Sequence, residues 1–192
     1  MNADHDSLQP GEEEALELTR RWLERAVIGL NLCPFAKAVY AKQQVRFVYS
    51  DATTPEQLIE QLGEELLLLR DTPADQLDTT LLVHPHVLQD FLDYNDFLEQ
   101  ADALVEVLEL DGELQVASFH PDYQFADSGP DDIENYSNRA PYPTLHLLRE
   151  DSVSRAVDAY PDPGSIIERK YATLRELGHA GWKALFRPRD AG

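Results

Sequence analysis

The sequence predicts one domain of the α/β (or α+β) class, built on a single mixed sheet of about four strands flanked by helices. The chain has 192 residues, which suits one compact domain, and 43% of them are hydrophobic, enough to form a core. Short runs of β-branched and aromatic residues alternate with longer stretches in which apolar residues recur at helical spacing. This alternation is typical of a sheet covered by helices.

The first part of the chain predicts an acidic tail and two helices. Residues 1–10 are polar and lack apolar periodicity, so we expect a flexible tail there and one globular domain over residues 11–192. Apolar residues at helical spacing run from about Glu12 to Gly29, a residue type common at helix ends. Pro34 suits the first position of a second helix, because a proline there sacrifices no backbone hydrogen bond.

The rest of the chain predicts four strands with helices between and after them. Strands are expected at residues 45–49, 79–83, 114–119 and 144–148. Helices are expected around residues 55–69 and 88–108, from about Ser152, and from a capping box at Ser165 and Glu168 to Gly178. The strand-helix-strand steps favour parallel pairing of the first three strands. The third and fourth strands have no helix between them and are expected to be antiparallel neighbours.

The charge of the chain restricts its partners. Thirty-six acidic residues against 16 basic ones give a formal net charge of −20, which would repel nucleic acid and anionic membranes. No stretch approaches the length of a membrane span, and the N-terminus has no signal-peptide pattern, so we expect a cytoplasmic protein. A single cysteine rules out a disulfide within the chain. The composition leaves the oligomeric state and any cofactor open.

Cys33 is the first candidate for chemistry. A second helix beginning at Pro34 would place Cys33 at the helix N-terminus, where the helix dipole can activate a thiol. Cys33 would then be a nucleophile or a redox centre. The alternative is that Cys33 is a small buried residue that fills the core, since cysteine is often buried.

The second candidate is a long polar segment, residues 120–143, because connections of this length in a compact domain are often functional. His120 could act as a general acid or base. The only basic residue between Arg70 and Arg149 is Arg139, which suits it to an anionic substrate group. The substrate-binding residues predicted here are Tyr123, Asn135, Asn138 and Arg139. Alternatively, the segment is a solvated acidic loop that Arg139 ties down through an ion pair.

A third candidate is a metal site at the ends of the strands. His84 and His86 follow the second strand, and His120 follows the third. If these strands are parallel, the three imidazoles approach one another, and Asp127 could complete a zinc or iron site. The His-Pro-His spacing is also compatible with a simple turn, so a metal remains an alternative to the thiol.

Four segments resemble a bacterial family called domain of unknown function 1415. They are Gly29–Ala36, Phe119–Asp127, Pro130–Tyr136 and Asn138–Glu150, within a resemblance that runs from the first helix to Trp182. The resemblance implies that the Cys33 segment and residues 120–139 are signature segments of this family. It brings no activity with it.

Three functions remain open on these observations. The favoured one is a small-molecule enzyme with Cys33 as nucleophile or redox thiol, His120 as acid or base, and Arg139 as anion anchor. A metal-dependent hydrolase or oxygenase using His84, His86, His120 and Asp127 is the first alternative. The second is a binding module without catalysis, whose acidic faces meet a basic partner.

Overall fold

The structure, a computed structural model, describes residues 10–187; most of the expected tail and the last five residues lie outside this range. The strands are β1 (Val45–Tyr49), β2 (Thr79–Val83), β3 (Leu114–Phe119) and β4 (Thr144–Arg149). The long helices are α1 (Glu12–Trp22), α3 (Pro55–Asp71), α4 (Phe91–Val107) and α6 (Ile166–Leu185). The shorter ones are α2 (Ala36–Ala41), α5 (Glu150–Asp158), a π-helical continuation of α1 (Leu23–Ile28) and two 3₁₀ turns (Ile133–Ser137 and Pro163–Ser165).

The four strands form one mixed sheet in the order β1-β2-β4-β3, which confirms the predicted α+β class. Strands β1 and β2 are parallel, and β4 is antiparallel to both β2 and β3. The predicted β3–β4 pairing is therefore correct, and the first three strands run in the same direction. However, the predicted parallel pairing of β2 with β3 is wrong, because β4 inserts between these two strands.

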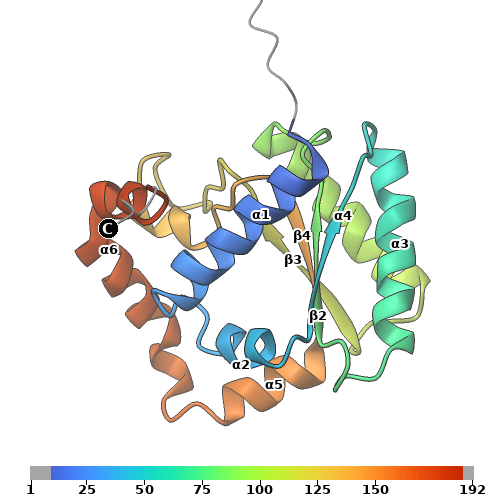
Figure 1. The fold of residues 1–192 in the computed structure, drawn as a ribbon. Helices are drawn as coiled ribbons and strands as arrows, with labels where there is room; N and C mark the ends of the chain where they lie inside the picture. Colours follow the sequence, from blue (N-terminus) through green and yellow to red (C-terminus); the bar gives the residue numbers. More distant parts are fainter. Residues whose placement is uncertain (1–9, 188–192) are drawn as a thin grey trace, which may run out of the picture.

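Helices cover both faces of the sheet (Figure 1). Helices α3 and α4 pack on one face, and α1, α2, α5 and α6 lie on the other. Alternation along the strands explains the two layers, because successive side chains point to opposite faces. In β4, Leu145 and Leu147 belong to the core under α3 and α4, whereas His146 between them faces the second layer.

Two predicted helix starts are wrong in detail. Helix α2 begins at Ala36, so Pro34 and Cys33 lie in the turn before it rather than at its first positions. The predicted capping box at Ser165 does not form, because the Ser165 hydroxyl donates to the Asp162 carbonyl at the end of a 3₁₀ turn. By contrast, α3 begins at Pro55 as predicted, and the Thr54 side chain caps it by accepting from the Gln57 backbone N–H.

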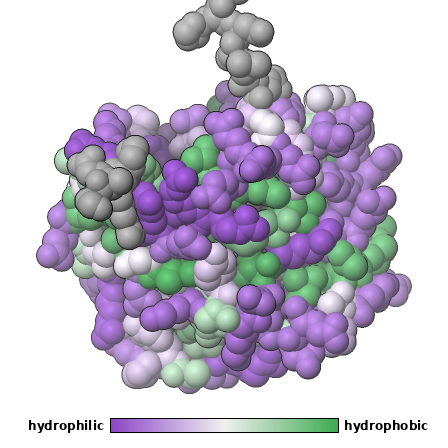
Figure 2. Space-filling model, in the orientation of Figure 1, coloured by the Kyte–Doolittle hydropathy of each residue, from purple (hydrophilic) through white to green (hydrophobic). Residues whose placement is uncertain are grey.

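The edge strand β1 is partly open to the surface. Figure 2 shows apolar surface gathered in the middle of the side of the molecule that faces the viewer. In the same orientation, Figure 1 places the free edge of the sheet there, between α1 and α3. Phe47 of this strand is covered by the Arg20 guanidinium at 4.6 Å from its ring centre. Within residues 10–187, each helix is too short or too polar to cross a bilayer.

Candidate functional site

A cavity of about 990 Å³ lies on the face of the sheet that α1, α2 and α5 cover. Its floor consists mainly of side chains from β2, β4 and the edge strand β3, and its walls come from the helices and the turn before α2. Floor residues include Thr79, Leu81, His146, Ala117 and Phe119. Trp22, Cys33, Phe35, Val39, Val153 and Tyr160 are among the wall residues. The hollow is mainly apolar and has the size of a small-molecule site.

His146 brings an imidazole to the apolar floor of this cavity. Its Nε2 lies 2.7 Å from Thr79 Oγ1, and the same hydroxyl lies 2.6 Å from the Leu147 carbonyl oxygen. Burial lowers the pKa of His146 to about 4, so the ring is neutral at pH 7. The alternation Leu145-His146-Leu147 in the sequence indicates that this side chain faces away from the core under α3 and α4.

Cys33 lies half-buried on the wall of the same cavity. It occupies a turn whose backbone hydrogen bonds join the end of the π-helical segment to α2. The Cys33 amide donates to the Val27 carbonyl and the Cys33 carbonyl accepts from the Ala36 amide. Because α2 is a six-residue helix that starts three residues later, the predicted activation of Cys33 by a helix dipole has no structural basis.

Lys170 of α6 lies within electrostatic range of Cys33. It is half-buried, and burial lowers its pKa. Further polar groups lie on the rim of the cavity, where Ser152 bridges the Asp78 carboxylate and the Arg155 guanidinium. Its hydroxyl lies 2.5 Å from Asp78 Oδ1 and 3.1 Å from an Arg155 nitrogen. Lys42 also lies on the rim.

His120 lies apart from this cavity, on the side of the sheet that α4 covers. Its ring packs against Phe91 and Tyr94 and is fully buried. Nε2 donates to the Leu88 carbonyl at 3.1 Å, and Nδ1 accepts from the Asp122 amide at 3.0 Å. Burial lowers the pKa of His120, which keeps the ring neutral. With both nitrogens occupied by the backbone, His120 is not placed to act with Cys33.

The polar groups of the long segment hold the segment together. Asn135 is buried; its Oδ1 accepts from the Phe125 amide and the Ser128 hydroxyl, and its Nδ2 donates to the Gly129 carbonyl. Asn138 Nδ2 donates to the Ser118 carbonyl of β3.

Arg139 fastens the same segment. Its guanidinium donates to the carbonyls of Tyr123 and Pro130 and lies 4.5 Å from the centre of the Tyr136 ring. These contacts match the interpretation in which Arg139 holds the loop in place, and not the one in which it anchors a substrate anion. Arg139 does so by binding carbonyls and an aromatic ring rather than a carboxylate. The Tyr123 ring packs on Phe91 and Phe125.

The four residues of the metal alternative are only partly brought together. His84 and His120 are close enough for the charge of one to lower the pKa of the other, as expected from strands that run in the same direction. His84 Nδ1 is 3.1 Å from the Val87 carbonyl, and His86 Nε2 is 2.5 Å from the Tyr49 hydroxyl. Across residues 10–187, no three His, Cys, Asp or Glu side chains, Asp127 included, are grouped as metal ligands.

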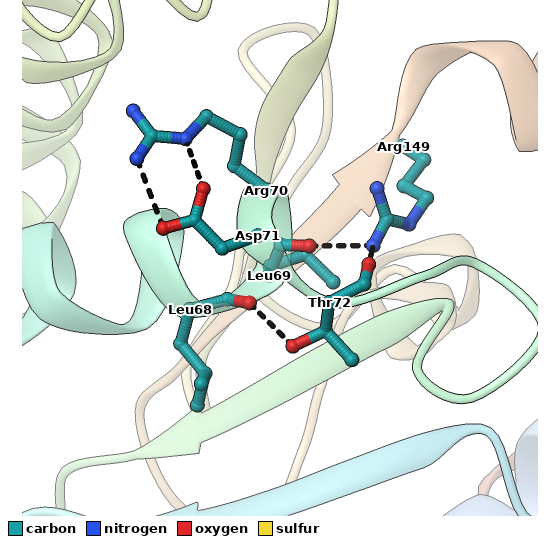
Figure 3. A network of polar contacts seen from close by, with 6 residues as sticks. All are labelled: Leu68, Leu69, Arg70, Asp71, Thr72 and Arg149. Atoms are coloured by element: carbon teal, nitrogen blue, oxygen red, sulfur yellow. Dashed lines mark hydrogen bonds and ion pairs between the residues drawn. The ribbon is translucent and has the colours of Figure 1, made fainter.

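Arg149 is a structural residue that the sequence did not single out. It follows the apolar part of β4, and its guanidinium donates to the carbonyls of Leu69 and Thr72 (Figure 3). It also donates to the Leu77 carbonyl. These carbonyls include the C-terminal ones of α3, which the helix itself leaves without partners. Arg149 therefore fixes the end of α3 beside the cavity that it also lines.

The fold and the cavity together define an α+β domain with helices on both faces of a four-stranded sheet and a ligand-sized hollow in one layer. The chain belongs to the family described as "Protein of unknown function (DUF1415)", which matches residues 14–184. This range contains every residue discussed above for the cavity and for the long segment. No curated protein and no solved structure matches the chain.

Proposed function

We propose that the protein is a small-molecule enzyme that binds a mainly apolar organic substrate in the cavity and uses Cys33 as its nucleophile. One observation carries the proposal: the only cysteine of the chain lies on the wall of a cavity of about 990 Å³. Ligand sites of this size, apolar with a few convergent polar groups, are typical of enzymes that act on small molecules.

The surroundings of Cys33 support this role. The thiolate is the nucleophilic form of cysteine, and the half-buried cation of Lys170 on α6 lies within electrostatic range of Cys33. In the proposed step, the thiolate attacks an electrophilic carbon and forms a C–S bond, and the group it displaces leaves with the bonding electron pair. Lys42 and Arg155 on the rim take over the anion-anchoring role expected of Arg139. A cytoplasmic location fits the proposal, because it keeps a lone thiol reduced.

Alkylation of Cys33 in the folded full-length protein tests the proposal. We expect iodoacetamide to modify Cys33 in the native state, and 4-butylphenol, an apolar probe sized for the cavity, to slow the modification at least fivefold. The Cys33→Ser variant is the blank. Modification that occurs only on unfolding, or at a rate that a saturating probe leaves unchanged, contradicts the proposal.

A variant of Lys170 allows a second measurement on the same site. Replacing Lys170 by Met removes the cation near Cys33, so we expect the alkylation rate of Cys33 at pH 7.5 to fall several-fold. Lys183→Met, an exposed lysine on the same helix, is the matched control and should leave the rate unchanged. Equal rates in the two variants would remove Lys170 from the mechanism.

A further inference from the structure

We infer that His146 is a ligand-binding residue that presents its unprotonated Nδ1 to the cavity and accepts a hydrogen bond from an O–H or N–H group of the bound molecule. The inference rests on the cavity of the proposed function and names the chemical class of its ligand. That class is an apolar molecule with a hydrogen-bond donor near its inner end, such as an alkylphenol or an aromatic amine.

The hydrogen-bond chain below the ring fixes which nitrogen carries the proton. A carbonyl oxygen can only accept, so the Thr79 hydroxyl must donate its single hydrogen to the Leu147 carbonyl, 2.6 Å away. The hydroxyl oxygen then accepts from His146, 2.7 Å away, which places a hydrogen on Nε2. In a neutral imidazole the other nitrogen, Nδ1, is left as a bare acceptor.

This acceptor has no partner in the part of the chain that the structure describes. The only hydrogen bond of the His146 side chain is the one to Thr79, so Nδ1 is unpaired. Nδ1 is nevertheless not one of the unpaired polar atoms that are completely buried. It is therefore open to the cavity that His146 lines. His120 has both ring nitrogens bonded to the backbone, whereas the unpaired nitrogens of His84 (Nε2) and His86 (Nδ1) are sealed in the interior.

The surroundings of the ring make this acceptor selective. Phe119 packs against the ring at 5.7 Å between centres, and Leu81 and Ala117 lie beside it in the sheet. No charged side chain forms an ion pair or a hydrogen bond with the ring in residues 10–187. An apolar ligand without a donor would leave Nδ1 unpaired in these surroundings, which costs binding free energy.

The test compares two probes of nearly equal shape. 4-Butylphenol carries the donor and its methyl ether, 4-butylanisole, lacks it; their dissociation constants are measured by calorimetry on the full-length protein. The quantity of interest is the ratio of the two constants, compared between wild type and His146→Phe, because this comparison cancels the different hydration of the probes. We expect the preference for the phenol to fall about tenfold in His146→Phe.

Two threonine variants separate positioning from packing. Thr79→Val removes the hydroxyl that holds the proton on Nε2, so we expect the preference for the phenol to fall there too. Thr80→Val, the next residue on the same strand, faces the other core and should leave the preference unchanged. If Thr79→Val and Thr80→Val behave alike, Thr79 does not position the ring.

Nitrogen chemical shifts of the histidine rings in the wild-type protein provide a measurement that needs no variant. We expect His146 to carry its proton on Nε2 and 4-butylphenol to shift the Nδ1 resonance. A proton on Nδ1, or an unchanged preference in His146→Phe when both probes bind, overturns the inference and leaves the proposed function standing. If neither probe binds, the cavity is not a ligand site, and the proposed function falls together with the inference.

Discussion

At the scale of single residues, partners decide which side chains are available for chemistry. His120 and Arg139 have the right chemistry for an active site, yet the backbone occupies both ring nitrogens of one and the guanidinium of the other. His146 keeps one ring nitrogen free beside a cavity. Two histidines of one chain, His120 and His146, therefore differ in the chemistry that they can perform. Contacts between residues far apart in the sequence cause this difference.

Thr79 and Thr80 allow a direct comparison of a bonded and an unbonded hydroxyl. The Thr80 hydroxyl is buried without a hydrogen-bond partner, so we expect Thr80→Val to raise the free energy of unfolding by about 1 kcal/mol. The Thr79 hydroxyl makes two hydrogen bonds, and Thr79→Val should lower the same quantity by about 1 to 2 kcal/mol. Urea unfolding of both variants measures this, and a change of the same sign in both would contradict the hydrogen-bond assignment.

At the scale of elements, helix α6 shows how a single glycine shapes a segment. Gly178 has φ 62° and ψ 175°, a conformation almost restricted to glycine, and it divides the helix into two parts. The parts anchor separately, through Leu174 before the break and Trp182 after it. The sequence predicted the end of a helix at Gly178, which is where the first part ends.

Gly178 of α6 and Gly63 of α3 should respond in opposite ways to alanine. We expect Gly178→Ala to lower the free energy of unfolding by about 1 to 3 kcal/mol, because an L-residue is strained in that conformation. Gly63 lies inside α3, where an added Cβ would meet Leu104 at an ordinary 3.7 Å, so Gly63→Ala should raise it by about 1 kcal/mol. Chemical unfolding of the two variants measures both changes in the free energy of unfolding. A loss of stability in Gly63→Ala would show that the close packing of α3 on α4 cannot take a methyl group.

At the scale of the whole molecule, each layer of the core contains a neutral histidine, fully buried at His84 and half-buried at His146. His84 lies in the layer of α4, stacked on Tyr94, and His146 lies in the layer of α1 and α5. Burial lowers the pKa of each ring to about 4, well below the ordinary value near 6.5. Protonating either ring would place a charge in an apolar layer, so the stability of the fold depends on both rings remaining neutral.

The stability of the molecule should therefore decrease on acidification. The unfolded chain binds protons at these histidines from about pH 6.5, whereas the folded chain binds them only near pH 4. Their contribution is thus fully present above pH 6.5 and is lost as the pH falls toward 4, by at most about 1.4 kcal/mol per pH unit for each histidine. Urea unfolding between pH 7 and 4.5 measures the slope. His146→Phe should show a shallower slope than wild type, and equal slopes would contradict a buried neutral His146.

Most of the helices and strands could be predicted from local sequence patterns, because apolar periodicity is a local property. The strand over 79–83 and the start of α3 at Pro55 were predicted correctly for this reason. The sequence also made Cys33 a candidate for chemistry, as the only thiol in the chain. The insertion of β4 between β2 and β3, which sets His146 and Thr79 side by side on the floor of the cavity, appears only in the three-dimensional fold. A cavity and the partners of a polar group depend on packing between segments distant in sequence, and local patterns do not encode that packing.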